Sequence, residues 1–181
     1  MVKLDFDDVL IVPQFSDITS RSQVETVTTI EGRWGASITG APIIAANMDG
    51  VGTFSMNSAL AKFNAFTAIT KHKQLHDWVN VYDAEAVSNY AFITIGMNDD
   101  ELRKAMDIVE VWKDRISKFT PKIVIDVANG YMNPFYDFIN KVRFNIPDAF
   151  IMAGTVVTPE AVMRVIDSGA DLARVGIGTG A

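Results

Sequence analysis

The sequence predicts an α/β protein built around a parallel β-sheet, and three observations lead to this prediction. Six short apolar runs of strand length recur along the chain. None of them alternates polar with apolar residues, which is typical of strands buried on both faces. Segments whose apolar residues have helical spacing separate the runs. This organisation fits a (β/α)₈ barrel or a doubly wound sheet, although a barrel needs eight strands.

The predicted strands end in polar or glycine-rich sequence. These ends read NMDG, TKHK, IGMNDD, DVANGY, AGTVVT and GIGTGA. In both candidate folds ligands bind at the C-terminal ends of the strands, so six such ends together favour a functional rim over a set of plain turns. The predicted strands cover residues 41–48, 65–70, 91–96, 122–130, 149–154 and 172–178.

Helix start signals follow several of these strands. Side chains that cap helices, prolines for the first turn and acidic residues for the positive helix end all occur where a helix is expected. A short amphipathic segment surrounds Trp78, where His76 and Trp78 are interpreted as packing or surface residues. The start signals are Thr53, the pair Asp99 and Asp100, Asn133 with Pro134, and Thr158 with Pro159.

The composition predicts a single cytoplasmic domain over residues 1–181. Of these residues 49% are hydrophobic and 21% are charged, as in ordinary globular proteins. A net charge of −6 argues against nucleic acid or a membrane surface as the main partner. No apolar run reaches the roughly 20 residues of a membrane span. The absence of cysteine excludes disulfides, thiolate metal sites and a cysteine nucleophile within the chain.

Three charged residues at strand ends are candidates for chemistry, and each has a plainer alternative. Lys71 is either a solvated charge or a cation placed for a phosphate or an oxyanion. Asp126 ends a buried strand, so it is either a helix cap or a group that orients a ligand. Asp49 poses the same choice. The final GIGTGA differs from the dinucleotide pattern G-x-G-x-x-G, but its alternating glycines expose backbone groups that suit a cation or a phosphate.

Taken together, several segments resemble the IMP dehydrogenase/GMP reductase family, and the reductases within it. The segments, in chain order, are VKLDFDDVLIVP, SRSQVE, PIIAANMDGVGTF, DVANGY, IMAGTVVT and SGADLARVGIGTG. The resemblance implies a partial TIM (β/α)₈ barrel with about six of eight β/α units, ending in the loop after strand 6. It also implies a homotetramer that binds GMP and IMP, and NADPH-dependent reductive deamination of GMP to IMP and ammonia through a cysteine that attacks the purine C2.

The resemblance assigns roles to particular positions. Lys71 and Asp126 match catalytic positions that also contact the cofactor. The other expected cofactor contacts are Ser20, Arg21, Val127, Ala128, Ile177 and Gly178. The expected substrate contacts are Asn47, Met48, Asp49 and Thr155. Carbonyl groups of Gly178 and Gly180 are expected to bind a potassium ion.

Some positions depart from the family pattern. Met97 stands where the family has a threonine used in deamination, and methionine cannot relay a proton. Thr155 replaces an asparagine, and Ala181 replaces a serine near the nucleotide phosphate. These departures put the exact substrate and rate in question.

The family's cysteine would follow Ala181, which leads to the hypothesis of a split enzyme. In this hypothesis a complementary C-terminal fragment with the catalytic cysteine completes the barrel, through a split gene or ligation by an intein, and the chain alone is inactive. Unpaired edges of the six strands predict aggregation or oligomerisation of the chain alone. The alternatives are a fragment of an IMP dehydrogenase-type oxidoreductase, a non-catalytic remnant that only oligomerises, and a simple truncation.

Overall fold

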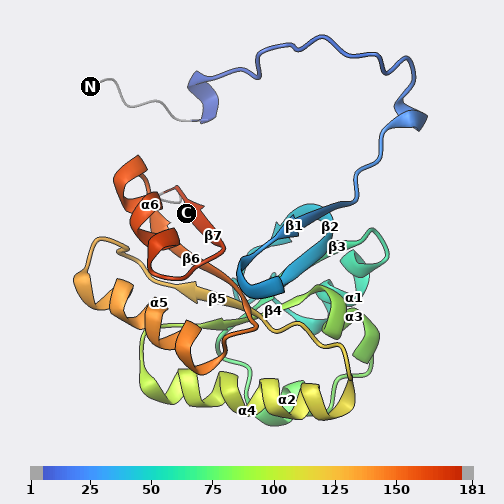
Figure 1. The fold of residues 1–181 in the computed structure, drawn as a ribbon. Helices are drawn as coiled ribbons and strands as arrows, with labels where there is room; N and C mark the ends of the chain where they lie inside the picture. The colour runs from blue at the N-terminus through green and yellow to red at the C-terminus, as the bar shows by residue number, and fades with distance from the viewer. Residues whose placement is uncertain (1–5, 177–181) are drawn as a thin grey trace.

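A computed structural model describes residues 6–176 and contains one curved, seven-stranded sheet in the order β1-β2-β3-β4-β5-β6-β7 (Figure 1). Every neighbouring pair from β2 to β7 is parallel, which confirms the predicted parallel sheet. The six predicted strands are all present. They are β2 (Ser37–Ala45), β3 (Ala65–Ile69), β4 (Ala91–Ile95), β5 (Lys122–Asp126), β6 (Phe150–Val156) and β7 (Leu172–Val175).

Two elements of the structure, a strand and a helix, were not predicted from the sequence. Strand β1 (Thr28–Glu31) pairs antiparallel with residues 37–40 of β2, so it covers only the N-terminal half of that strand's edge. Helix α3 (Ala84–Tyr90) lies between the short helix α2 and β4. The remaining helices are α1 (Phe54–Ala61), α2 (Leu75–Val79), α4 (Asp99–Arg115), α5 (Asn133–Asn145) and α6 (Pro159–Asp167), with short 3₁₀ turns η1 (Phe6–Asp8), η2 (Arg21–Gln23) and η3 (Arg33–Gly35).

Most helices begin where their capping residues predict. Thr53 accepts a hydrogen bond from the Met56 backbone N–H at 3.1 Å, and Thr158 accepts one from Ala161 at 3.3 Å. The predicted cap Asn133 is wrong by one residue, because α5 begins at Asn133 itself. Its side-chain oxygen instead accepts a hydrogen bond from Arg164 at 2.8 Å, so it ties α5 to α6.

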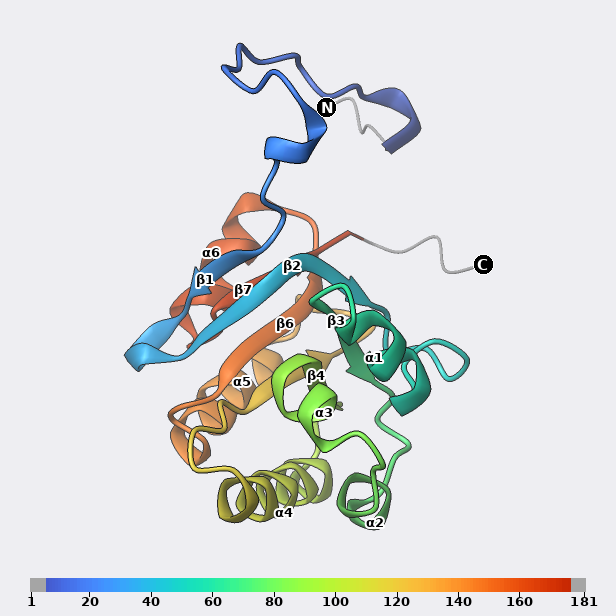
Figure 2. The ribbon, with the colours of Figure 1, turned by 90° about the vertical axis from the view of Figure 1, so that its right-hand side faces the viewer.

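Both faces of the sheet are apolar, and each face has its own core. The outer core packs the sheet against the helices, which follow the outside of the curve in Figure 2. The inner core lies within the curve and is built from aromatic and small side chains. Its buried members are Ala36, Ile38, Phe66, Ala68, Phe92, Val124 and Phe150. Two apolar faces explain why the strands lack polar alternation.

At the N-terminal end of the sheet, one buried carboxylate holds the two sides of the curve together. Asp171 accepts hydrogen bonds from the backbone N–H of Arg33 and of Ile151, each at 2.7 Å. It also forms an ion pair with Arg143 at 2.6 Å, and its own side chain is fully buried. Trp34 completes this group, because the Arg143 guanidinium lies 4.9 Å from its ring centroid. We call these five residues the Asp171 cluster.

Residues 6–27 form an arm that extends away from the sheet in both views (Figures 1 and 2). Apolar side chains of this arm are exposed, among them Leu10, Ile11 and Phe15. Within residues 6–176, no helix has the length and apolarity needed to cross a membrane.

Candidate functional site

Three polar side chains meet where β2, β5 and β7 end, on the inner face of the sheet. The Asn47 amide donates to Asp126 Oδ2 at 2.9 Å. Arg174 forms an ion pair with Asp126 Oδ1 and lies 3.5 Å from the Asn47 side-chain oxygen. We call Asn47, Asp126 and Arg174 the polar triad. Its carboxylate therefore receives two side-chain donors, and this satisfies the charge that was expected to need partners.

A glycine allows the triad to form across an intervening strand. Arg174 lies on β7 and Asp126 on β5, so the ion pair must cross β6, where Gly154 is the register partner of Asp126. A Cβ atom at Gly154 would lie 2.5 Å from the Arg174 carbonyl oxygen and 2.7 Å from its Cβ. Any side chain there would push β7 away. The absence of a side chain at Gly154 thus lets Arg174 reach Asp126.

An apolar cavity of about 190 Å³ lies beside the triad inside the curve of the sheet. Asn47 and Arg174 contribute its polar atoms, and small or apolar side chains form the rest. These are Ile44, Ala45, Ala46, Ala68, Val124 and Met152. A concave apolar site with a few convergent polar groups is typical of sites that bind small molecules.

Two more of the predicted residues lie at the neighbouring strand end, after β3. The Asp49 carboxylate accepts a hydrogen bond from the Thr70 hydroxyl at 2.9 Å, and His72 Nε2 lies 3.7 Å from the same oxygen. Lys71 is half-buried, and its carbonyl accepts a hydrogen bond from Lys104 at 2.6 Å. Across residues 6–176 its ammonium group has no hydrogen-bond or ion-pair partner, so it is available to an anion.

The predicted residues after β5 and β6 extend the pairing of these strands. The Val127 N–H donates to Gly154 at 3.0 Å, and the Val127 carbonyl accepts from the Thr155 N–H at 3.2 Å. The Val127 side chain is buried in the outer core, whereas Ala128 is exposed and Thr155 is half-buried. Of these three, Ala128 and Thr155 have side chains that a ligand at the rim can reach.

The structure does not bring the remaining predicted residues to the triad. Ser20 and Arg21 lie on the arm, where Ser20 caps η2. Met48 is 60% exposed. Met97 packs with the outer core, between the starts of α4 and α5, and not on the inner face. Ile177, Gly178 and Gly180 lie outside the described residues.

Two residues at this rim, Arg174 and Tyr131, were not predicted from the sequence. Arg174 is a charged residue inside the otherwise apolar strand LARV, and that contrast was an available signal. The Tyr131 hydroxyl accepts hydrogen bonds from the backbone N–H of Val157 at 2.9 Å and of Thr158 at 3.1 Å. A hydrogen bond with the Thr158 side chain, together with these backbone bonds, lowers the pKa of Tyr131. The phenol thereby fixes the loop after β5 to the start of α6.

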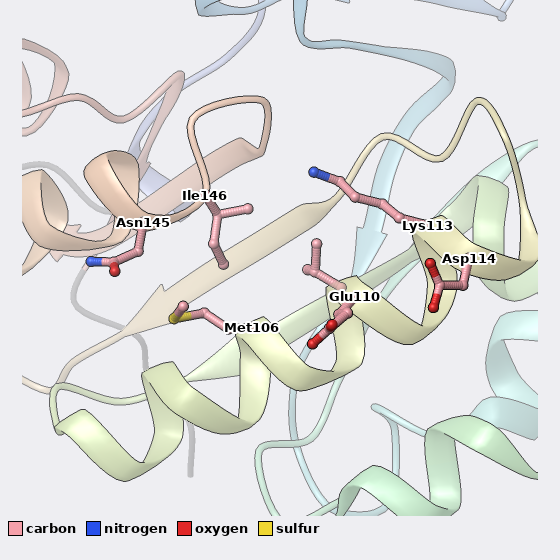
Figure 3. A pocket seen from close by; sticks show the side chains of 7 residues that line it. Met106, Glu110, Lys113, Asp114, Asn145 and Ile146 are labelled. Atoms are coloured by element: carbon pink, nitrogen blue, oxygen red, sulfur yellow. The ribbon is translucent and has the colours of Figure 1, made fainter.

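A second hollow lies on the outer face, away from the strand ends (Figure 3). It has a volume of about 350 Å³ between α4 and the end of α5, with an apolar base that includes Met106 and Ile146. On its rim Lys113 forms an ion pair with Asp148 at 2.7 Å. Because it lies on the opposite side of the sheet from the triad, we do not include it in the candidate site.

Comparisons with known proteins agree with the family predicted from the motifs. The family model described as "IMP dehydrogenase / GMP reductase domain" matches residues 3–181. A GMP reductase of Photobacterium profundum is 43% identical over 183 residues, covering 99% of this chain and 51% of that protein. A GMP reductase of Buchnera aphidicola subsp. Acyrthosiphon pisum is 42% identical over 182 residues, with the same coverage.

The fold comparison gives the same result. The crystal structure of inosine 5' monophosphate dehydrogenase from Legionella pneumophila superposes with a TM-score of 0.74 at 26% identity, covering 97% of this chain and 51% of that one. The prediction of a partial (β/α)₈ barrel is confirmed, and the chain spans about half the length of the relatives that it matches. The chain belongs to the IMP dehydrogenase/GMP reductase family.

Proposed function

We propose that this chain provides about half of a GMP reductase, an oxidoreductase that converts GMP to IMP and ammonia with NADPH. The supporting observation is its 43% identity to a GMP reductase along 99% of its own length. In the proposed reaction, a hydride from NADPH replaces the amino group at C2 of the guanine, and the amino group takes up one proton and leaves as ammonia, which yields IMP and NADP⁺. The polar triad and its cavity are the proposed binding surface for the reacting groups.

The residues at the rim fit a phosphate-containing dinucleotide in charge and exposure. Lys71 offers an ammonium group without a partner among residues 6–176, which suits a phosphate of NADPH. Ala128, which follows β5, and Thr155, on β6, offer further accessible side chains at the strand ends. When bound, NADPH supplies the hydride. Asp126 holds the Asn47 amide and the Arg174 guanidinium in place, and this pre-organised polar surface is suited to orienting a purine.

We also infer that a complementary segment completes the barrel and supplies the nucleophile. This chain has no cysteine, and its relatives have about as much sequence again. Among the described residues, both edges of the parallel sheet are incompletely paired. On one side, β7 pairs only with β6. On the other side, β1 pairs with residues 37–40 of β2 and leaves residues 42–45 without a partner. Ile43 and Val175 are exposed on these strands at 63% and 59%. Additional strands pairing there would cover both edges.

The test is reconstitution of activity. The chain is co-expressed with the half of the Photobacterium profundum GMP reductase that it does not match, and NADPH oxidation is followed by absorbance with GMP as substrate. We expect activity from the reconstituted pair and none from either part alone. Activity of the isolated chain would contradict the need for a complementary segment. A pair that assembles but turns over neither GMP nor IMP would favour a non-catalytic remnant.

A second assay separates the two activities of the family. The same pair is supplied with IMP and NAD, and turnover under these conditions alone would favour an IMP dehydrogenase. Within the pair, Asp126→Asn keeps the size of the side chain but removes the charge that holds Arg174, so we expect about 10- to 100-fold lower kcat/KM. Asp114→Asn, an exposed carboxylate on α4, is the matched control and should leave kcat/KM unchanged.

A further inference from the structure

A polar pocket with a buried lysine lies at the other end of the strands, away from the polar triad. Its volume is about 310 Å³, and it is lined by the beginning of β2, the end of α3 and the segment that leads into β5. Lys122, the first residue of β5, lines this pocket although only 4% of the residue is exposed, and its ammonium group is bonded to two other residues of the lining. Lys118 adds a second ammonium group, which is exposed.

The ammonium group of Lys122 is only partly satisfied by the protein. It donates to the backbone carbonyls of Ser88 at 2.8 Å and of Thr120 at 3.0 Å. An ammonium group has three N–H donors, so one remains. Its Nζ atom lies over the Phe119 ring, 5.6 Å from the ring centroid, and this cation–π contact favours the charged form.

No carboxylate balances this charge. Among the described residues that line the pocket none is acidic, although the chain has 22 aspartates and glutamates against 16 lysines and arginines. A buried charge normally has a counter-charge, because its desolvation is costly. In this structure desolvation lowers the pKa of Lys122 to about 7. An anion in the pocket would supply the missing counter-charge.

The other lining groups suit an oxyanion. Ser37 and Thr120 provide hydroxyl groups, which can donate hydrogen bonds to phosphate oxygens, and the Thr39 hydroxyl, which is 2.9 Å from that of Thr29, adds a third. We propose that this pocket is a binding site for an oxyanion of the phosphate class, with Lys122 as its buried anchor and Lys118 as its second cation. The site is separate from the proposed catalytic rim, because Lys122 begins β5 whereas Asp126 ends it.

The site is tested by titrating the full chain with inorganic phosphate in a calorimeter, alone and within the reconstituted pair. We expect saturable binding that Lys122→Gln weakens at least tenfold, since a charge-assisted hydrogen bond is lost. Lys118→Gln should weaken it to a smaller extent. Lys62→Gln, which removes the same charge from an exposed position outside the pocket, should leave the affinity unchanged. Parallel titrations with glycerol phosphate distinguish a site for phosphate monoesters from a site for the free ion.

A measurement on the unmodified chain covers the case in which the Lys122 variant does not fold. Lysines are acylated with a mild reagent, and each is quantified by peptide mass spectrometry with and without phosphate. Phosphate should protect Lys122 and Lys118 but not Lys62. If Lys122 only ties the end of α3 to the segment before β5, phosphate will protect none of the three. That result, or equal affinity of the Lys122→Gln variant and the unmodified chain, would overturn the proposal.

Discussion

The buried position of Lys122 predicts an unusual dependence of stability on pH. Burial lowers the pKa of its ammonium group from 10.5 to about 7 in the folded protein. Between these two values the unfolded chain binds a proton at this site and the folded chain does not. The free energy of unfolding therefore rises with pH across this window, and below about pH 7 the full cost of burying the charge is present.

The magnitude follows from the width of the window. Each pH unit within it changes the free energy of unfolding by up to about 1.4 kcal/mol. Because titration is only half complete at the folded pKa, the Lys122 contribution between about pH 7 and about pH 9 is roughly 2 kcal/mol in favour of the folded state at the higher pH. Other titrating groups also change the free energy of unfolding with pH. The Lys122 contribution is therefore measured as the difference between the unmodified chain and a variant that lacks this lysine.

The experiment compares the unmodified chain with Lys122→Met, which keeps the length of the side chain and removes the charge. Urea unfolding, followed by tryptophan fluorescence at both pH values, gives the free energy of unfolding of each protein. The unmodified chain should gain about 2 kcal/mol relative to the variant on going to the higher pH. Lys62→Met serves as a control with an exposed lysine and should follow the unmodified chain. An identical pH dependence in the chain and in Lys122→Met would refute the reasoning.

Three further predictions concern other contacts. Asp171→Asn removes the charge that balances the buried Arg143, so the free energy of unfolding measured in urea should fall by about 3–5 kcal/mol; a loss below about 1 kcal/mol would contradict a closing role for this carboxylate. Gly154→Ala places a Cβ atom where the Arg174 backbone lies, so the reconstituted pair should lose activity while a substitution to alanine at the exposed Asp114 has no effect. Tyrosine ionisation is followed by absorbance in the unmodified chain and in the Tyr131→Phe variant, and the difference between the two titration curves should show one phenol with a pKa below the ordinary value of tyrosine. An ordinary pKa for this phenol would argue against the hydrogen bonds to its oxygen.

Local signals were sufficient to predict most of the fold. Thr53 and Thr158 cap helices through bonds to residues three positions along the chain, so their role is visible in the sequence itself. The central strands β3 to β6 were visible because they are buried on both faces and therefore read as apolar runs. Strand β1 was not visible. Its residues are mostly exposed and form no apolar run. The turn that follows it is fixed by a distant contact, the hydrogen bond from the Arg33 backbone N–H to Asp171, which local sequence does not reveal.

In the candidate site, too, features set by neighbouring residues could be predicted, whereas contacts between distant residues could not. The position of Asp126 at the end of a buried strand predicted that it needs partners. The partners themselves could not be predicted, because Arg174 lies 48 residues along the chain and reaches Asp126 only across Gly154. Lys122 was missed for a related reason. It begins an apolar strand, where a lysine ordinarily reaches solvent, and only the folded chain surrounds it.

The bond between Arg33 and Asp171 also constrains the order in which the protein folds. It joins residues 138 positions apart, whereas each parallel pair from β2 to β7 joins consecutive strands of the chain. Closing so long a loop has a high entropic cost, and contacts of this kind slow folding. During synthesis the strands can add one after another, but the hairpin of β1 and β2 has to wait for Asp171 to leave the ribosome. Until then the turn between β1 and β2 lacks this contact, so chaperone demand should be greatest just before the last described strand emerges.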